Sequence, residues 1–473
     1  MKSIIYQVLP RLWGNGKFSS VDAEAFSYWK SLGADYIWYT GLIRHASKSS
    51  GEKVVKGDAG SPYAITDYYD VNPYLADQPE NRMEEFQDLV HRTHAAGLKL
   101  VMDFVPNHVA REYVGTLGAG DNTTVHWASE NDFFYYPGQA LELPVPCGGY
   151  TEMPAKASGN CFTPAPDIND WWETVKINYC DFHTATWDKM LEIVRFWASK
   201  GVDGFRCDMV ELVPPQFMQW LIGSIKAEFP DVVFIAEVYQ KDKYRMYVEQ
   251  VGFDYLYDKC GLYDTLRAVC CNGASAREIS YNWQFLGDLQ PHMLNFLENH
   301  DEQRVASDFF CGSPEAGYAA LAVSLLLNTA PFMLYFGQEA GERGMQKEGF
   351  SGLDGRTSIF DWCTVPALEH PDEAVLARYR QVLSLASQPA FSEGRTFDLC
   401  YCQDAERFNP DRHFAFLRSD GKTTFLVVSN FGQVADITVR IPAEALDYLG
   451  IKLVRTVYSL TVNALDFTVI QVQ

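Results

Sequence analysis

The 473-residue sequence contains no run of 18 apolar residues, so no segment is expected to cross a membrane as a helix. The apolar run near the N-terminus, residues 4–9, is too short for the core of a signal peptide. Basic residues are few, with 39 Lys+Arg against 61 Asp+Glu and a net charge of −22. Nucleic acids and anionic membranes both attract clustered Lys and Arg. We therefore expect a cytoplasmic protein that binds neither nucleic acid nor membrane, whereas a neutral ligand meets no electrostatic penalty.

Paired metal-binding motifs are also missing. The eleven cysteines are scattered, and none follows the C-x-x-C or His/Cys spacing of a zinc site, so we expect mostly reduced, structural thiols. Apolar residues make up 47% and charged residues 21% of the chain, which excludes global disorder. Aromatic residues are abundant at 14%, and aromatic side chains often line ligand pockets.

Short apolar runs of strand length recur eight times, and helix-like amphipathic stretches lie between them. The runs cover residues 4–9, 35–39, 98–104, 202–206, 232–236, 253–257, 293–297 and 332–336. The clearest amphipathic stretches cover residues 82–96, 186–199, 215–229 and 315–327. This alternation predicts an α/β protein built on a (β/α)8 TIM barrel. An open doubly wound sheet is the alternative, but the number of units and the polar residues at the strand ends favour the barrel.

Two parts of the chain break this alternation. Residues 109–180 are rich in Gly, Pro, Asn and aromatic residues and predict a domain inserted after the third strand. Beyond residue 388, short apolar segments separated by turns predict a C-terminal antiparallel β-sandwich, at residues 413–418, 424–430, 434–441 and 467–473. We therefore predict a barrel of residues 1–108 and 181–388, an inserted domain of residues 109–180 and a β domain of residues 389–473.

Polar residues stand at the C-terminal ends of four predicted strands, which in a barrel share one face with the active site. The third strand ends in residues 103–108 (DFVPNH), the fourth in residues 204–208 (GFRCD), the fifth in Glu237, and the seventh in residues 298–301 (ENHD). Three carboxyl groups, two histidines and an arginine should therefore converge, namely Asp208, Glu237, Asp301, His108, His300 and Arg206.

These four segments, in this order, resemble the four signature regions of the α-amylase family of glycoside hydrolases (family 13). Residues 61–69 resemble the family stretch that supplies a stacking tyrosine, here Tyr63. The resemblance covers essentially the whole chain and implies a retaining hydrolase of α-glucans or maltooligosaccharides. It implies that Asp208 is the nucleophile, Glu237 the acid/base and Asp301 the stabiliser of the transition state. The predicted substrate-binding residues are Tyr63, His108, Arg206, His300 and Arg304, although Arg304 could instead pair with Glu302 or Glu339.

The residues themselves support these roles. Cleavage through an oxocarbenium-like transition state needs one carboxylate and one carboxylic acid. Arg206 lies two residues before Asp208, so both should point to one face, and a neighbouring cation is expected to lower the pKa of Asp208. Glu237 follows three apolar residues, and apolar surroundings favour the protonated form that a general acid needs.

Other functions remain open at this point. A transglycosidase or isomerase, such as a glucanotransferase or a trehalose synthase, uses the same glycosyl-enzyme. A carbohydrate-binding protein without activity could have the same fold. Many family members that act from a chain end carry Asp directly after the stacking tyrosine, where this chain has Ala64. This difference weakens an exo-glucosidase interpretation.

The resemblance also raises the question of a structural calcium between barrel and inserted domain. Asn107 matches one ligand position of the family, but Lys176 stands where a metal-binding aspartate is expected, and Leu212 stands at a position that gives only its carbonyl. Calcium takes six to eight oxygen ligands, mostly from carboxylates, and an ammonium group would repel it. We therefore predict no calcium and no other cofactor; the alternative is that Asp167 or Asp170 binds the ion.

Overall fold

Eight parallel strands form a closed barrel in a computed structural model that describes residues 2–115, 117, 121–179, 184–346 and 350–473. Around the barrel the order is β1-β14-β13-β12-β11-β10-β5-β2. The strands are β1 (Ile4–Val8), β2 (Tyr36–Tyr39), β5 (Lys99–Phe104), β10 (Gly204–Cys207), β11 (Val233–Ala236), β12 (Tyr255–Tyr257), β13 (Met293–Phe296) and β14 (Phe332–Tyr335). Each predicted run overlaps one of these strands, so the predicted barrel is confirmed.

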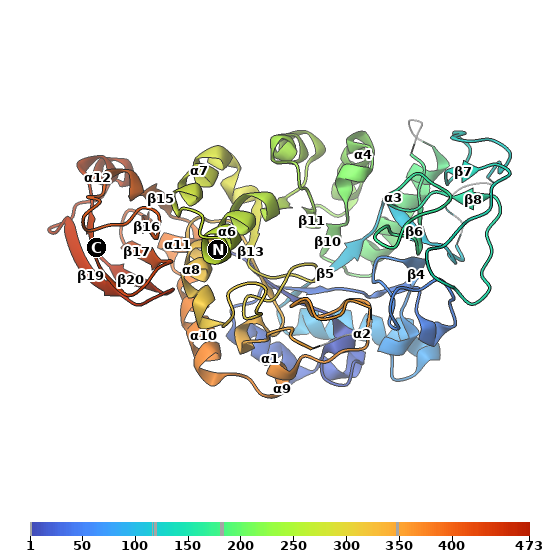
Figure 1. The fold of residues 1–473 in the computed structure, drawn as a ribbon, viewed down its shortest axis with the longest axis horizontal. Helices are drawn as coiled ribbons and strands as arrows, with labels where there is room; N and C mark the ends of the chain where they lie inside the picture. The colour runs from blue at the N-terminus through green and yellow to red at the C-terminus, as the bar shows by residue number, and fades with distance from the viewer. Residues whose placement is uncertain (1, 116, 118–120, 180–183, 347–349) are drawn as a thin grey trace.

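Helices surround the barrel (Figure 1) and bury their apolar faces against it. The longer ones are α1 (Ala23–Ser31), α2 (Arg82–Ala95), α3 (Ala185–Ser199), α4 (Pro215–Glu228), α6 (Asp264–Cys271), α7 (Arg277–Leu286), α8 (Tyr318–Leu326) and α10 (Glu373–Ala386), and the short ones are α5 (Tyr244–Met246), α9 (Pro366–Glu369) and α11 (Pro389–Ser392). After α2 the chain turns at Gly97, whose φ of 76° is one that glycine adopts without strain. No helix in the described part of the chain has both the length and the hydropathy to span a bilayer.

Among the described residues of the segment between β5 and α3, the strands are short. In it β6 (His108–Ala110) pairs antiparallel with β9 (Thr174–Lys176), and β7 (Tyr135–Tyr136) pairs with β8 (Ala155–Lys156). A further hairpin, β3 (Ile43–His45) with β4 (Ile65–Val71), follows β2. Figure 1 shows the inserted segment at one end of the molecule and the C-terminal strands at the other. The predicted boundary between residues 180 and 181 lies outside the described residues.

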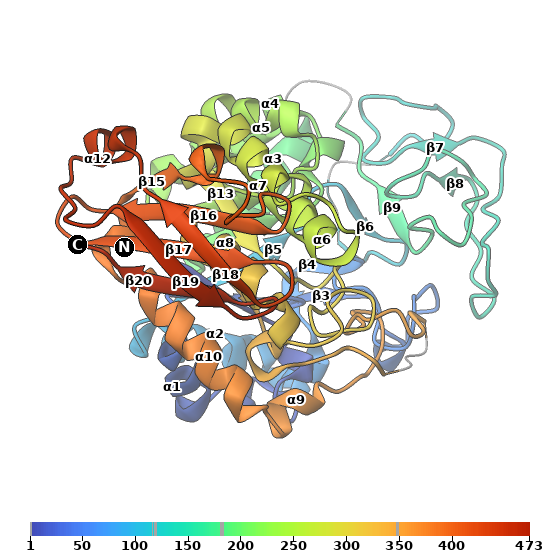
Figure 2. The same cartoon turned by 60° about the vertical axis from the view of Figure 1, so that its left-hand side comes forward.

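The C-terminal strands form two antiparallel sheets (Figure 2). One contains β15 (Arg395–Asp398), β16 (His413–Ser419), β17 (Thr424–Asn430) and β20 (Phe467–Gln471), and the other β18 (Ala435–Arg440) and β19 (Val457–Val462). Apolar residues of both sheets, such as Leu417 and Ile437, share one buried cluster, as in the predicted sandwich. The sequence did not predict β15, β19 or the helix α12 (Ala443–Leu449).

Candidate active site

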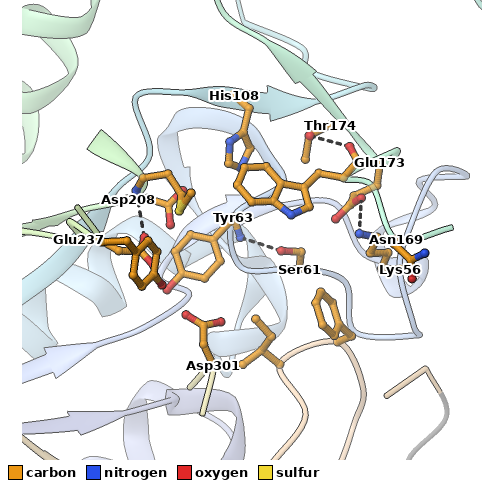
Figure 3. Close-up of a pocket in the computed structure, with 15 residues that line it drawn as sticks. Lys56, Ser61, Tyr63, His108, Asn169, Glu173, Thr174, Asp208, Glu237 and Asp301 are labelled. Carbon is orange, nitrogen blue, oxygen red and sulfur yellow. Dashed lines mark hydrogen bonds and ion pairs between the residues drawn. The ribbon is translucent and has the colours of Figure 1, made fainter. Parts of the chain in front are cut away.

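A cavity of about 360 Å³ lies at the C-terminal ends of the barrel strands. Asp208, Glu237 and Asp301 follow β10, β11 and β13, and all three line it (Figure 3). The other lining residues are Lys56, Ser61, Tyr63, His108, Asn169, Trp171, Glu173, Thr174, Met209, Tyr239, Ile359 and Phe360. The barrel therefore brings the three predicted acids into one cavity, and Tyr63 and His108 line the same cavity.

Arg206 in β10 is the cation around which the acids gather, and its side chain is fully buried. Nη1 donates a hydrogen bond to Oδ1 of Asp208 at 2.8 Å and lies 3.5 Å from Oδ1 of Asp103. Nη2 lies 2.8 Å from Oε2 of Glu237, and Nε donates to the hydroxyl of Tyr257 at 3.2 Å. Arg206 thus lies beneath the cavity and holds Asp208 and Glu237 with one guanidinium group, rather than contacting the cavity itself.

Burial affects the charge of Asp208 more strongly than Arg206 does. Loss of solvent raises the pKa of Asp208 well above its ordinary value, Arg206 opposes this rise, and the neighbouring acids Glu237 and Asp103 add to it. The expectation that Arg206 keeps the pKa of Asp208 low is therefore wrong for the net shift. The acid cluster retains a proton at pH values where an isolated aspartate has lost its own.

The surroundings of Glu237 are more polar than the sequence suggests. Met209, directly after Asp208, has a φ of 43°, which is rare for a residue with a side chain. This turn lets the Met209 N–H donate to Oε2 of Glu237 at 2.9 Å, while the hydroxyl of Tyr239 donates to Oε1 at 2.6 Å. The apolar residues before Glu237 lie within the strand and are buried in the barrel. Only the end of the strand reaches the cavity, so these residues do not surround the carboxyl group. The expected apolar environment of this carboxyl group is therefore wrong.

Asp301 is held by His300 beside it. Nε2 of His300 lies 3.1 Å from Oδ2 of Asp301, and Gln7 of β1 contacts Nδ1 of His300 at 2.8 Å. Burial opposes the charge of Asp301, but the pKa of Asp301 falls to about 2 because His300, Arg206 and Arg356 outweigh that effect. Asp301 therefore carries its negative charge more readily than Asp208 does.

Tyr63 forms one wall of the cavity. Its ring stacks on His300 with 5.3 Å between centroids, and its hydroxyl lies 2.5 Å from Nε2 of His300. The same hydroxyl donates to Asp103 at 3.3 Å, and Trp38 Nε1 donates to the other oxygen of Asp103 at 3.0 Å. His300 therefore acts from beneath the cavity, between Tyr63 and Asp301.

His108 lines the cavity with a neutral ring. Burial lowers the pKa of His108 to about 3, and the cations Lys176 and Lys56 contribute to the fall. Its ring lies 5.2 Å from that of Trp171. A neutral imidazole next to an aromatic ring suits an uncharged, hydroxyl-rich ligand.

Several residues of the site were not assigned from the sequence. Gln7 is a polar residue inside a buried strand, and Tyr239 stands two residues after Glu237, on the same side of the extended chain. Asp103 is the last residue but one of β5 and lies within a recognised motif. Each carried a signal, because a polar residue in an apolar run needs a hydrogen-bond partner. The partners, however, come from other strands, and only the closed barrel shows them.

Arg304 does not face the cavity, so its predicted role in substrate binding is not supported. Its buried guanidinium donates to Oε2 of Glu298 at 3.0 Å, to the Phe336 carbonyl at 2.8 Å, and to Oγ1 of Thr357 at 2.8 and 3.0 Å. The alternative partners, Glu302 and Glu339, were also wrong, since Glu298 is the acid bound. Every nitrogen of this side chain has a partner inside the protein, so none is left for a ligand.

The position expected for calcium is taken by the ammonium group of Lys176. Nζ of Lys176 donates to the carbonyl of Leu212 at 2.6 Å and to the side-chain oxygen of Asn107. Both oxygens that would ligate calcium therefore contact an ammonium group. Asp167 is exposed and Asp170 is half-buried, and within the described ranges no three His, Cys, Asp or Glu side chains are grouped to hold a metal ion.

A closed parallel barrel with a cluster of acids at its strand ends defines a TIM-barrel protein with an enzyme-like site. Residues 22–361 match the family model described as "Alpha amylase, catalytic domain". The chain therefore belongs to the alpha-amylase family.

Comparison with individual proteins gives low identity over long stretches. Alpha-amylase MalA of Haloarcula japonica is 28% identical over 453 residues, covering 93% of this chain and 57% of that protein. An alpha-1,4-glucan:maltose-1-phosphate maltosyltransferase of Cereibacter sphaeroides is 24% identical over 279 residues, covering 53% of this chain and 34% of that protein. The chain spans between about half and two thirds of the length of the first curated relatives it matches.

The fold agrees with a solved structure described as a noncanonic maltogenic alpha-amylase, AmyB, from Thermotoga neapolitana. The TM-score is 0.67 at 21% sequence identity, and the match covers 100% of this chain and 96% of that one. At this identity the likeness concerns the fold, including the barrel, the insertion and the C-terminal sheets.

Proposed function

We propose that this protein is a retaining glycoside hydrolase that cleaves α-glucosidic bonds of α-glucans or maltooligosaccharides. The observation that carries the proposal is the contact of one guanidinium, that of Arg206, with both Asp208 and Glu237 at 2.8 Å. Retaining enzymes hold their two carboxyl groups about 5–5.5 Å apart, and inverting enzymes hold them roughly 6.5–9.5 Å apart. A shared guanidinium favours the shorter spacing, and membership of the alpha-amylase family supports the substrate class.

In the proposed reaction a carboxylate oxygen of Asp208 attacks the anomeric carbon while Glu237 gives a proton to the glycosidic oxygen. The bond to the leaving sugar breaks as an ester to Asp208 forms. Glu237 then takes a proton from water, whose oxygen displaces Asp208 and restores the enzyme. Asp208 must react as the anion, and Arg206 favours that form because it counters the rise in the pKa of Asp208 that burial causes.

Asp301 and the neutral side chains complete this mechanism. The low pKa of Asp301 keeps it negative, so it stabilises the positive charge of the oxocarbenium-like transition state and accepts hydrogen bonds from sugar hydroxyls. His108 and Tyr63 bind hydroxyl groups and the sugar face from the cavity wall. The molecule that attacks the glycosyl-enzyme in the second step decides the outcome: water gives hydrolysis and a sugar hydroxyl gives transfer.

A transglycosidase is the second candidate, favoured by the similarity to a maltosyltransferase; a trehalose synthase-like isomerase would use the same intermediate. A non-catalytic binding protein is less well supported, because three carboxyl groups line one cavity. We further propose a cytoplasmic location, supported by the ten cysteines of the described residues, which form no disulfide among themselves.

The experiment is an NMR time course on maltoheptaose. We expect the α-anomer to appear first, before mutarotation, because two displacements retain the configuration. Oligosaccharides longer than the substrate would indicate transfer, and a β-anomer as first product would contradict the role of Asp208. Binding without any new reducing end would point to the non-catalytic alternative.

A further inference from the structure

The cavity has a second charged end, away from the catalytic acids. Figure 3 shows Asp208 and Glu237 on one side and Lys56 and Glu173 on the other, with Tyr63 between them. An acid that protonates the leaving group stands on the leaving-group side of the scissile bond. The opposite end therefore receives the sugar whose anomeric carbon is attacked, and beyond it the non-reducing end of the chain.

Lys56 and Glu173 form a buried ion pair at this end. Nζ of Lys56 lies 3.1 Å from Oε2 of Glu173, and the side chains are 7% and 4% exposed. The same ammonium donates to the carbonyl of Asp170 at 2.9 Å. Apart from this ion pair, Oε2 of Glu173 is buried with no hydrogen-bond donor in the described part of the chain. A carboxylate oxygen can accept from more than one donor, so a ligand hydroxyl in the cavity can contact it as well.

The loop that carries Lys56 also contacts the loop after β14, beside this pair. The N–H groups of Ala59 and Gly60 donate to the carbonyl of Phe360 at 2.9 and 3.1 Å. Gly57 has a φ of 65°, and a Cβ there would lie 2.2 Å from the same carbonyl oxygen. Only glycine permits this approach. Ile359 is fixed in turn, because its carbonyl accepts a hydrogen bond from Arg11 at 2.5 Å.

Three segments therefore build one wall: residues 56–61 after β3, residues 169–174 of the inserted segment, and residues 359–360 after β14. Lys56 connects the first to the second through Glu173 and Asp170, and the contacts with Phe360 connect the first to the third. A wall held by buried charges and backbone hydrogen bonds resists displacement by a substrate better than a mobile loop does.

We propose that this wall closes the cavity at the non-reducing end and that Lys56 and Glu173 bind the hydroxyls of the terminal sugar. The enzyme then acts from the chain end and releases short sugars, because an internal stretch of a long glucan cannot run past the wall. This inference rests on the proposed function. Ala64 lacks the carboxylate that many chain-end enzymes carry after the stacking tyrosine, and Glu173 supplies one from the inserted segment instead.

The first test uses the unaltered enzyme and three substrates: maltoheptaose, maltoheptaose with its non-reducing end blocked by a 4,6-ethylidene group, and β-cyclodextrin. Products are separated by chromatography. We expect maltoheptaose to be cleaved at least about a hundredfold faster than the blocked and cyclic substrates. Comparable rates on all three would overturn the inference and leave the proposed function intact, whereas no cleavage of any would overturn both.

The second test alters the pair. The double variant Lys56→Met/Glu173→Gln removes both charges, so no uncompensated buried ion remains. We expect kcat/KM on maltotriose to fall about ten- to a hundredfold, mainly through KM, as for the loss of hydrogen bonds to charged groups. The preference for free over blocked maltoheptaose should fall as well.

The control for this variant is Lys48→Ala. Lys48 lies in the same loop and pairs with Asp58 at 2.6 Å, but both side chains are mostly exposed, at 57% and 66%, so kcat/KM and the preference should not change. A folded double variant, checked by its thermal unfolding, that keeps the original KM and substrate preference would show that the pair only holds the loops together.

Discussion

Arg206 and Arg304 are both fully buried and both close in sequence to a predicted catalytic acid, yet their surroundings differ. Arg206 contacts three carboxyl groups, those of Asp103, Asp208 and Glu237. Arg304 contacts one carboxyl group, that of Glu298, and otherwise a carbonyl and a hydroxyl. The first cluster has more acids than its cation can balance, and the second is balanced.

This difference separates a reactive cluster from a structural one. Around Arg206, burial and the neighbouring acids raise the pKa of Asp208 and Arg206 counters that rise, so the guanidinium favours the anion that a nucleophile needs. Around Arg304, burial raises the pKa of Glu298 to about 7 while Arg304 opposes the rise, and no part of the pair reaches the cavity. The number of acids for each buried cation, rather than distance along the chain, predicts which arginine serves the site.

The largest effect should come from removing either acid held by Arg206. Asp208→Asn removes the nucleophile and Glu237→Gln removes the transferable proton, so each should lower kcat by at least about a thousandfold. Steady-state kinetics on maltoheptaose and circular dichroism measure activity and fold, with the exposed Asp58→Asn as the control. More than about a tenth of the original rate in either variant would refute these roles.

Arg304→Met should affect stability rather than chemistry. Breaking a buried pair leaves an unpaired charge and costs about 3–5 kcal/mol. The pKa of Glu298 is about 7 in the folded protein and ~4.3 in an unfolded chain. The contribution of Glu298 to stability is therefore complete below pH ~4.3 and is lost as the pH rises through 7. Loss of Arg304 raises this pKa further, so the variant should lose more at pH 8 than at pH 5.

Urea unfolding at both pH values measures this effect, and Arg304→Met/Glu298→Gln is the matched control, because it has no carboxyl group left to titrate. The acid side of the pH–activity profile should stay where it is. A shift of that profile in Arg304→Met would mean that Arg304 belongs to the catalytic cluster after all.

Arg206→Lys should give a smaller effect, but on chemistry. Lysine keeps the charge and loses the planar fork that reaches Asp208 and Glu237 together. We expect kcat/KM to fall about ten- to a hundredfold. Arg206 lowers the pKa of Asp208 against the effect of burial. A weaker contact in the lysine variant should therefore move the acid limb of the pH profile of kcat/KM to higher pH. An unchanged limb, or one moved to lower pH, would contradict this account.

Much of the site could be predicted because a parallel barrel converts sequence order into position. Asp208, Glu237 and Asp301 each follow a buried strand, and the ends of parallel strands meet at one face. His108 was placed near them by its position after the third strand, whereas Tyr63 was predicted only from the resemblance of residues 61–69 to a stretch of the family.

Loop contacts and local electrostatics could not be predicted in the same way. The direction of Arg304 depends on Thr357 and Phe336, which are far from it in sequence. Lys56 and Glu173 meet only because two irregular segments approach each other, and no periodicity encodes such an approach. Burial of Asp208 is likewise a property of the assembled cavity, so its neighbour in the sequence gave the wrong sign for its pKa.

Lys176 is a third buried cation to compare with Arg206 and Arg304. At this position we expect no effect of calcium on activity. Its ammonium group contacts the side-chain oxygen of Asn107 and the carbonyl of Leu212 at 2.6 Å, so charge and hydrogen bonding at this position are supplied by the protein. Calcium would have to displace a cation from these oxygens without a carboxylate in exchange. We therefore expect activity and thermal unfolding to be unchanged by EDTA and by added calcium. Lys176→Met should lower the unfolding temperature by leaving both acceptors unpaired, without creating a response to calcium. Activity lost on chelation and restored by calcium would instead show that the ion binds elsewhere, with Asp167 and Asp170 as the first residues to test.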